Sequence, residues 1–385
     1  MEFDKIKQLI EKQEIQTISL DTSIFKAEGL KLESGLLKQL GQFSDTSIKI
    51  IISEVVKNEL LNHLEEIPKS LYTDIDRLLK DAQTYCQFEG DIDLIKASLF
   101  QGRRPEEIAY DRLKNFIETT SVEIIQVQGN VEVSELLNKY FKNKSPFAGT
   151  GKKKNEFPDA IALMSLESWA KKNMKRVLVI SIDNDWKRYC AHSQNLVFLE
   201  SLSKCFELFQ EVKPYNICRH LSKKYYQEEL YFIKKAINHT LENQIFDFNI
   251  HIEANSSYQY EDEITNISHE GNEFKIIKKP NIIFIPIKFD NDTLVVQAEL
   301  NVNISIECNF YFTVWDSIDG EDVGIGANTI EKQEDLDITV LITLIDESGK
   351  FDEDIEVDEV EIITTNIKID FDYIEPDWRD QNDDD

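Results

Sequence analysis

Two different patterns of hydrophobic and polar residues divide the sequence. Up to about residue 210, short runs rich in Ile and Val alternate with longer stretches of helical periodicity. Uninterrupted apolar runs are typical of strands buried on both faces of a parallel sheet, so this part is predicted to be an α/β domain with a central parallel sheet. The predicted strands are residues 17–20, 48–52, 122–127, 177–182 and 196–199, and the predicted helices include residues 54–67, 71–85, 105–119, 131–141 and 157–172.

After Phe246 the pattern changes to apolar residues that mostly alternate with polar ones, as in residues 294–314. Alternation of this kind is typical of antiparallel strands with one face in solvent, and turn signals separate the strands. We therefore predict a β-sandwich-like second domain. The expected organisation is an α/β domain at residues 1–215, a bridging helix at 216–244, an acidic β-rich domain at 245–378 and a frayed tail at 379–385.

Charge is distributed unevenly between these parts. The chain of 385 residues has 43 basic and 72 acidic side chains, a net charge of −29, and 41% of its residues are hydrophobic. That apolar content excludes a wholly disordered acidic chain. The first 244 residues carry 35 basic and 36 acidic side chains, whereas the remainder carries 8 and 36. Net negative charge repels a phosphate backbone, so contact with nucleic acid is expected only in the first part.

The five cysteines are widely spaced and form no CxxC pair, which argues against a disulfide framework or a zinc site. The first residues lack the pattern of a signal peptide, and the longest apolar stretches are too short to cross a bilayer. We therefore expect a cytoplasmic protein that makes no membrane contact.

Acidic residues directly follow two of the predicted strands. Asp21 comes after the strand at 17–20, and Asp183 comes after the strand at 177–182. Both are expected at the carboxyl edge of the sheet, which is where α/β domains collect ligands. For either residue alone, the preferred interpretation is an N-cap of the following helix.

Two further acids make that simple interpretation less satisfactory. Glu59 falls inside the apolar arc of the helix at 54–67, where a carboxylate costs free energy unless something compensates it. Asp159 lies in the first turn of a largely apolar helix, where the helix dipole favours an anion. If the four acids meet in one pocket, a divalent cation would relieve their repulsion, and an all-oxygen set selects Mg²⁺ or Mn²⁺. Phosphodiester hydrolysis is the natural reaction of such a site.

At these four acids the chain resembles the PIN-domain ribonucleases, over about residues 15–210. The matching segments are the opening strand with Asp21 and Thr22, the helix with Glu59, the stretch Glu-Phe-Pro-Asp-Ala at 156–160, and the Ser-x-Asp motif of Ser181 and Asp183. The Glu-Phe-Pro-Asp-Ala wording is more similar to a group of larger bacterial PIN-like proteins than to the small VapC-type toxins. The stretch between the second and third segments, residues 68–155, is longer than in a minimal PIN domain.

The resemblance implies a Rossmann-like fold and metal-dependent cleavage of single-stranded or structured RNA. It assigns catalysis and metal binding to Asp21, Glu59, Asp159 and Asp183, with Thr22 and Ser181 in supporting positions. Asp185 is a further candidate metal ligand, although it also suits a helix cap.

A Lys-rich segment at residues 139–155 contains no acid and leads into Asp159. We interpret it as a phosphate-binding loop at the mouth of the site, and a simple solvated loop is the alternative. The candidate nucleic-acid-binding residues are Lys144, Lys152, Lys153 and Lys154.

The prediction is therefore an Mg²⁺- or Mn²⁺-dependent endoribonuclease, with a toxin or phage-defence role suggested by analogy alone. The alternative is a catalytically inactive PIN-like scaffold whose acidic β domain binds a regulatory protein partner. Both hypotheses are compatible with a homo-oligomer. A haloacid-dehalogenase-type phosphatase is rejected, because its Asp-x-Asp motif would need an acid where Ser23 stands.

Overall fold

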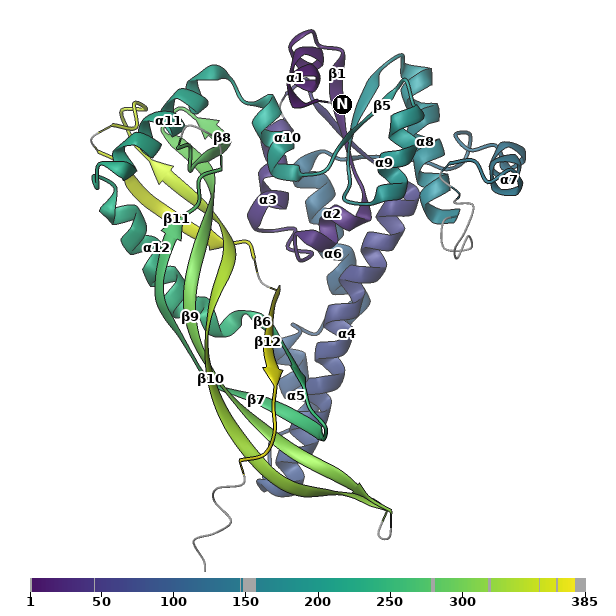
Figure 1. The fold of residues 1–385 in the computed structure, drawn as a ribbon. Helices are drawn as coiled ribbons and strands as arrows, with labels where there is room; N and C mark the ends of the chain where they lie inside the picture. Colours follow the sequence, from purple (N-terminus) through teal and green to yellow (C-terminus); the bar gives the residue numbers. More distant parts are fainter. Residues whose placement is uncertain are drawn as a thin grey trace, which may run out of the picture. The chain divides into compact units, whose positions relative to one another are not determined.

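The computed structural model describes residues 2–44, 46–145, 147, 157–277, 281–317, 320–352, 354–364 and 366–377. The chain divides into two compact units, Met1–Phe209 and Gln210–Asp385, and each is described here by itself. Figure 1 shows helices around a small sheet in the first unit and long strands in the second.

A five-stranded sheet with all strands parallel forms the centre of the first unit, in agreement with the prediction. The strand order is β3-β2-β1-β4-β5, so the chain moves outward in one direction from β1 to β3 and in the other from β4 to β5. Ligands bind at such a switch point in open α/β sheets, here between β1 and β4. The strands are β1 (Ile15–Leu20), β2 (Lys49–Ser53), β3 (Glu123–Ile125), β4 (Arg176–Ile180) and β5 (Leu196–Leu199).

Helices cover this sheet, and one of them extends far beyond it (Figure 1). The helices are α1 (Phe3–Glu11), α2 (Thr22–Ala27), α3 (Gly35–Lys38), α4 (Glu54–Tyr85), α5 (Ile92–Leu99), α6 (Pro105–Thr120), α7 (Val133–Phe141), α8 (Phe157–Asn173), α9 (Asn184–His192) and α10 (Leu202–Phe209), with a 3-10 turn η1 (Gln39–Phe43). α8 is buried on several sides because it contacts β2, β3, β4 and β5 as well as α4 and α9.

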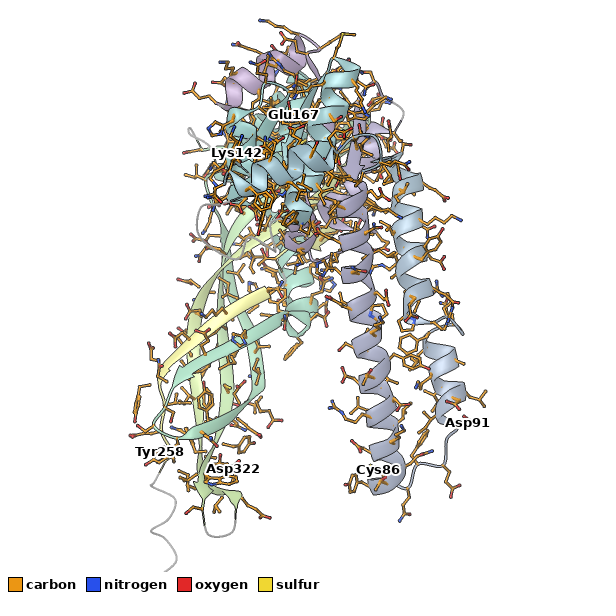
Figure 2. The ribbon with its side chains drawn as sticks, turned by 90° about the vertical axis from the view of Figure 1, so that its right-hand side faces the viewer. Cys86, Asp91, Lys142, Glu167, Tyr258 and Asp322 are labelled. Atoms are coloured by element: carbon orange, nitrogen blue, oxygen red, sulfur yellow. The ribbon has the colours of Figure 1, made fainter. Side chains whose placement is uncertain are left out.

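The two helices predicted at 54–67 and 71–85 are in fact one helix, α4, with Pro68 inside it. A proline normally ends or kinks a helix, which is why the sequence suggested a break. Pro68 is buried, and α4 packs against α5 and α6. In Figure 2, Cys86 and Asp91 mark the end of this helical arm, remote from the sheet.

The second unit contains an antiparallel sheet of order β11-β10-β9-β7, with β8 paired to β9. The predicted alternation is confirmed in β9, where Leu300, Val302 and Ile304 are buried and the residues between them are half-exposed. The strands are β6 (Asn249–Asn255), β7 (Gln259–Phe274), β8 (Ile285–Asp290), β9 (Thr293–Asp316), β10 (Glu321–Ile345), β11 (Glu356–Ile362) and β12 (Asn366–Tyr373).

One pair of strands departs from the antiparallel pattern. β6 pairs with β12 in parallel and forms a separate two-stranded sheet. Parallel neighbours need a long crossover connection, and here all the strands from β7 to β11 provide it. Alternation along β6 predicts a half-buried strand but does not reveal the direction of its neighbour.

The bridging helix predicted at residues 216–244 is in fact two helices, α11 (Val212–Tyr226) and α12 (Tyr231–Gln244), followed by a 3-10 turn η3 (Ile245–Asp247). Glu228, between them, has a φ of 63°, a left-handed conformation that ends a helix. Neither Gly nor Pro stands there, so the sequence carries no signal of the break. Apolar residues of both helices join the core under the sheet.

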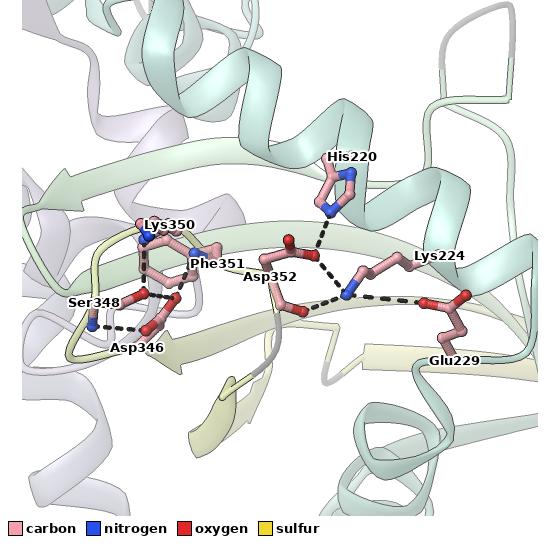
Figure 3. A network of polar contacts seen from close by, with 8 residues as sticks. All are labelled: His220, Lys224, Glu229, Asp346, Ser348, Lys350, Phe351 and Asp352. Carbon is pink, nitrogen blue, oxygen red and sulfur yellow. Dashed lines mark hydrogen bonds and ion pairs between the residues drawn. The ribbon is translucent and has the colours of Figure 1, made fainter.

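Polar contacts fasten α11 to the connection between β10 and β11 (Figure 3). Asp352 accepts a hydrogen bond from Lys224 at 2.8 Å and lies 3.0 Å from Nε2 of His220. In the same connection the buried Asp346 carboxylate accepts hydrogen bonds from the backbone N–H of Ser348 at 2.8 Å and from that of Phe351.

Candidate active site

Asp21 and Asp183 lie where two adjacent strands end. Asp21 directly follows β1, and its backbone N–H donates to the carbonyl of Ile180, the last residue of β4, at 3.0 Å. Asp21 is 4% exposed. Asp183 comes three residues after β4 and caps α9, since its carboxylate accepts the N–H of Asp185 at 2.5 Å. The two acids therefore share the sheet edge at the switch point.

Two serine hydroxyls hold the Asp21 carboxylate. Ser181 donates from Oγ to Oδ2 of Asp21 at 2.7 Å, and Ser23 donates to the same oxygen. Ser181 also accepts the N–H of Asp183 at 2.9 Å, so this buried hydroxyl links the two acids. Sequence reasoning missed the contact made by Ser23. The available signal was a hydroxyl two residues after an aspartate, a spacing at which Ser side chains make local hydrogen bonds.

Glu59 comes to the site from α4, which contacts α2. The hydroxyl of Thr22, the first residue of α2, donates to Oε2 of Glu59 at 2.6 Å. Glu59 is half-buried beside the fully buried Leu60. The base of α4 is fixed by Ser53, which caps the helix, and by Glu54, which accepts the N–H of Val127 at 3.0 Å.

Asp159, in the first turn of α8, is the most perturbed acid of the four. Burial raises its pKa to about 7, a hydrogen bond from Trp186 opposes this, and the negative charges of Asp21, Asp183 and Glu59 add to the rise. Because these charges act on Asp159, the four carboxylates lie in one electrostatic neighbourhood. Burial also raises the pKa of Asp21, against the hydrogen bonds from Ser23 and Ser181 and together with the charge of Asp183.

The geometry of this edge agrees with a comparison against protein families. Residues 18–186 match the family model of the PIN domain. This part of the chain is a PIN domain. The match includes all four acids and leaves the β-rich unit outside it. No curated protein and no solved structure matches the chain.

PIN domains have a nuclease-type fold and are usually nucleases that use divalent metal ions. Among the residues that the structure describes, no three His, Cys, Asp or Glu side chains are arranged as an assembled metal site. The donor set nevertheless fits a hard divalent cation, because it consists of carboxylate oxygens: burial raises the pKa of Asp159, and the charges of the other three acids add to that rise. Each acid is instead turned to a local donor, namely Ser181, Thr22, Trp186 or the N–H of Asp185.

The remaining candidate residues of the PIN domain lie in different surroundings. The Asp185 carboxylate forms an ion pair with Arg188 one turn further along α9. Lys144 is exposed, and its backbone N–H donates to the carbonyl of Lys139 at 2.9 Å. Lys152, Lys153 and Lys154 lie outside the described residues.

A polar pocket of about 650 Å³ lies elsewhere in the PIN domain, between α7, α8 and the connection from α9 to β5. Its lining includes Lys139, Glu167 and Tyr189, and contains none of the four acids. None of the described helices of either unit is long and apolar enough to cross a membrane.

Proposed function

We propose that the protein is a metal-dependent endoribonuclease whose PIN domain hydrolyses RNA phosphodiester bonds. The observation that carries the proposal is the electrostatic coupling of Asp159 to Asp21, Glu59 and Asp183 at the switch point of the sheet. A cluster of partly buried carboxylates costs folding free energy unless hydrogen bonds or a cation compensate it, and perturbed acids gather at functional sites.

In this proposal the four acids would hold Mg²⁺ or Mn²⁺, which supplies an activated water and stabilises charge on the phosphate. Ser181 and Ser23 orient the Asp21 carboxylate, and Thr22 orients Glu59. Asp185 can be a further metal ligand only if its ion pair with Arg188 breaks. The lysines of the segment before α8 are proposed to bind the RNA backbone, because each contact of a lysine with a phosphate releases condensed counterions. These lysines are Lys144, Lys152, Lys153 and Lys154.

The test uses matched RNA and single-stranded DNA of one sequence, labelled at the 5′ end, with the full chain in Mg²⁺, Mn²⁺ or EDTA. The expected result is internal cleavage of the RNA with either metal and none with EDTA. Asp21→Asn and Asp159→Asn should reduce cleavage by at least a hundredfold. Asp81→Asn, at an exposed position of α4, is the matched control and should cleave like the parent. Equal cleavage by parent and Asp159→Asn would disprove the assignment.

For the biological role we propose a toxin or phage-defence effector that acts in the cytoplasm. Expression of the parent in a bacterial host should then arrest growth or limit phage yield, and Asp21→Asn should do neither. Normal growth and normal phage yield with an active enzyme would exclude this role while leaving the nuclease proposal intact.

A second candidate function is an inactive PIN-like scaffold whose acidic β domain binds a basic protein partner. The sheet face formed by alternate residues of β7, β9 and β10 favours it. On that face Glu307 stands opposite Glu331, a like-charge pair that destabilises a sheet. Trp315 stands opposite Asp322, which Figure 2 labels at one end of the sheet, and is 59% exposed. An exposed tryptophan suits a binding surface, because tryptophan is a frequent anchor in interfaces. Other acids of this face include Glu261, Glu263, Glu273, Glu299, Asp335 and Asp337.

This second candidate predicts that a defined Lys/Thr-alternating peptide binds the chain and that Trp315→Ser weakens binding at least fivefold. Replacing two acids of β11 by their amides lowers the negative charge and keeps Trp315, so it measures the effect of charge alone. Weakening by the β11 change with parent-like binding by Trp315→Ser would mean that only net charge attracts the peptide. Sedimentation of the parent in the same experiment reports any homo-oligomer.

A further inference from the structure

Trp186 is a buried indole that contacts an acid of the candidate site. It is the third residue of α9 and is 1% exposed. Its Nε1–H donates to Oδ1 of Asp159, at the start of α8, at 2.8 Å. A buried indole N–H needs an acceptor, and this one uses a carboxylate and not a backbone carbonyl. The hydrogen bond therefore joins two helices at the site.

The surroundings of Asp159 make this donor important. Burial and the charges of Asp21, Glu59 and Asp183 all act against its ionised form, and the indole hydrogen bond acts for it. A carboxylate on a single short side chain rotates easily, whereas a large aromatic side chain packed in a core has one accessible rotamer. The rigid partner thus fixes the direction of the flexible one.

The base of α9 is fixed in turn. Asp183 caps this helix three residues before Trp186 and is tied through Ser181 to Asp21. The indole is therefore part of one connected set that begins at Asp21 and ends at Asp159. In metal sites, groups that orient the ligands commonly change metal affinity by 10- to 100-fold when removed.

We propose that Trp186 is a positioning residue that holds the Asp159 carboxylate in the orientation needed to bind a divalent cation. The inference rests on the proposed nuclease function. The competing explanation is that the indole only fills space in the core, in which case its N–H contributes to folding and not to cation binding.

The experiment measures Mn²⁺ binding to the full chain from the electron paramagnetic resonance signal of free Mn²⁺. Trp186→Phe keeps an aromatic ring and removes the N–H, and it should weaken Mn²⁺ binding about tenfold. Trp169→Phe is the matched control, because Trp169 is 9% exposed on α8 but ten residues, or about 15 Å of helix, from Asp159. It should bind Mn²⁺ like the parent.

Two further measurements locate the cation and separate positioning from packing. Tryptophan-sensitised Tb³⁺ luminescence should be strong in the parent and in Trp169→Phe and lost in Trp186→Phe, because the nearest indole donor is then missing; parent-like luminescence of Trp186→Phe would place the cation away from Trp186 and overturn the proposal. Replacement of Trp186 by benzothienylalanine, which has sulfur in place of N–H and nearly the same shape, should weaken Mn²⁺ binding as Trp186→Phe does. This second replacement keeps the test valid if Trp186→Phe fails to fold.

Parent-like Mn²⁺ affinity of the folded benzothienylalanine protein would overturn the positioning role, and cleavage by the parent would then still support the nuclease. Absence of both Mn²⁺ binding and RNA cleavage in the parent would overturn the nuclease proposal and the positioning role together.

Discussion

Asp159→Asn should stabilise the protein while removing its activity. In the fold, burial and three neighbouring carboxylates raise the pKa of Asp159 from 3.8 to about 7. A folded-state pKa above the unfolded value means that the fold holds the proton more tightly, so stability falls as the pH rises from about 4 to 7. Above pH 7 Asp159 is ionised in the fold, and the full free-energy cost of burying its charge is present. Asparagine has the same shape, still accepts the Trp186 hydrogen bond through its amide oxygen, and has no proton to lose.

The shift of roughly three units corresponds to about 4 kcal/mol at 1.36 kcal/mol per unit. Solvent screening of this half-buried group reduces the expected gain to about 2 kcal/mol at pH 8. For a unit of this size that is about 4–8 °C in the melting temperature. By linkage, about half of the gain should remain at pH 5.5.

The assay is scanning calorimetry of parent and Asp159→Asn in EDTA at pH 5.5 and pH 8, followed by Mg²⁺ addition. Mg²⁺ should raise the melting temperature of the parent and not that of Asp159→Asn, because a ligand that binds only the folded state stabilises it. Asp81→Asn is the control and should melt like the parent at both pH values. A melting temperature of Asp159→Asn equal to or below that of the parent at pH 8 would refute the reasoning.

Three further predictions concern stability and thiol chemistry. Asp346→Ala should destabilise the second unit by about 1–3 kcal/mol in urea unfolding, since the N–H of Phe351 loses its acceptor. Burial raises the pKa of Asp346, but hydrogen bonds from Ser348 and Phe351 outweigh this and lower it, so the stability difference between the parent and Asp346→Ala should shrink as the pH falls. Ile304→Ala should cost about 2–5 kcal/mol in the same assay, because Ile304 is 0% exposed in the core; a change below 0.5 kcal/mol would contradict that packing. Iodoacetamide at pH 8 should label the exposed Cys86 within minutes and leave Cys205 unmodified in the folded protein, since burial raises the pKa of the Cys205 thiol; mass spectrometry of labelled peptides gives the answer, and equal labelling would contradict it.

The parallel sheet could be predicted because its strands are short, nearly pure apolar runs that alternate with helical patterns, as expected for strands buried on both faces. The alternating strands of the second unit were equally visible. The continuity of α4 through Pro68 was not, because it depends on packing against α5 and α6. The break at Glu228 was hidden for a similar reason, since a left-handed residue other than Gly leaves no mark in the sequence.

At the candidate site, the sequence predicted where each acid lies along its strand or helix, but not which group its side chain contacts. Asp21 and Asp183 could be assigned to one sheet edge because strand ends converge there. Ser23 is only two residues from Asp21, so its local hydrogen bond had a signal in the sequence, whereas Trp186 is brought to Asp159 only by the fold. The role of residues 210–244 in the second unit was also hidden, since a helix does not reveal which core its apolar face joins.

The strand order has a consequence for the protein during its synthesis. β1 lies at the centre of the sheet, but its neighbour β4 is made about 160 residues later, and the Ser181–Asp21 hydrogen bond spans the same separation. A ribosome-bound chain that ends before β4 therefore contains Asp21, Glu59 and Asp159 without the strand that brings Asp183 beside them. The four acids meet only after β4 and Asp183 have emerged, so under the proposed nuclease function the nascent chain lacks a complete site while it is still close to its own message and ribosome.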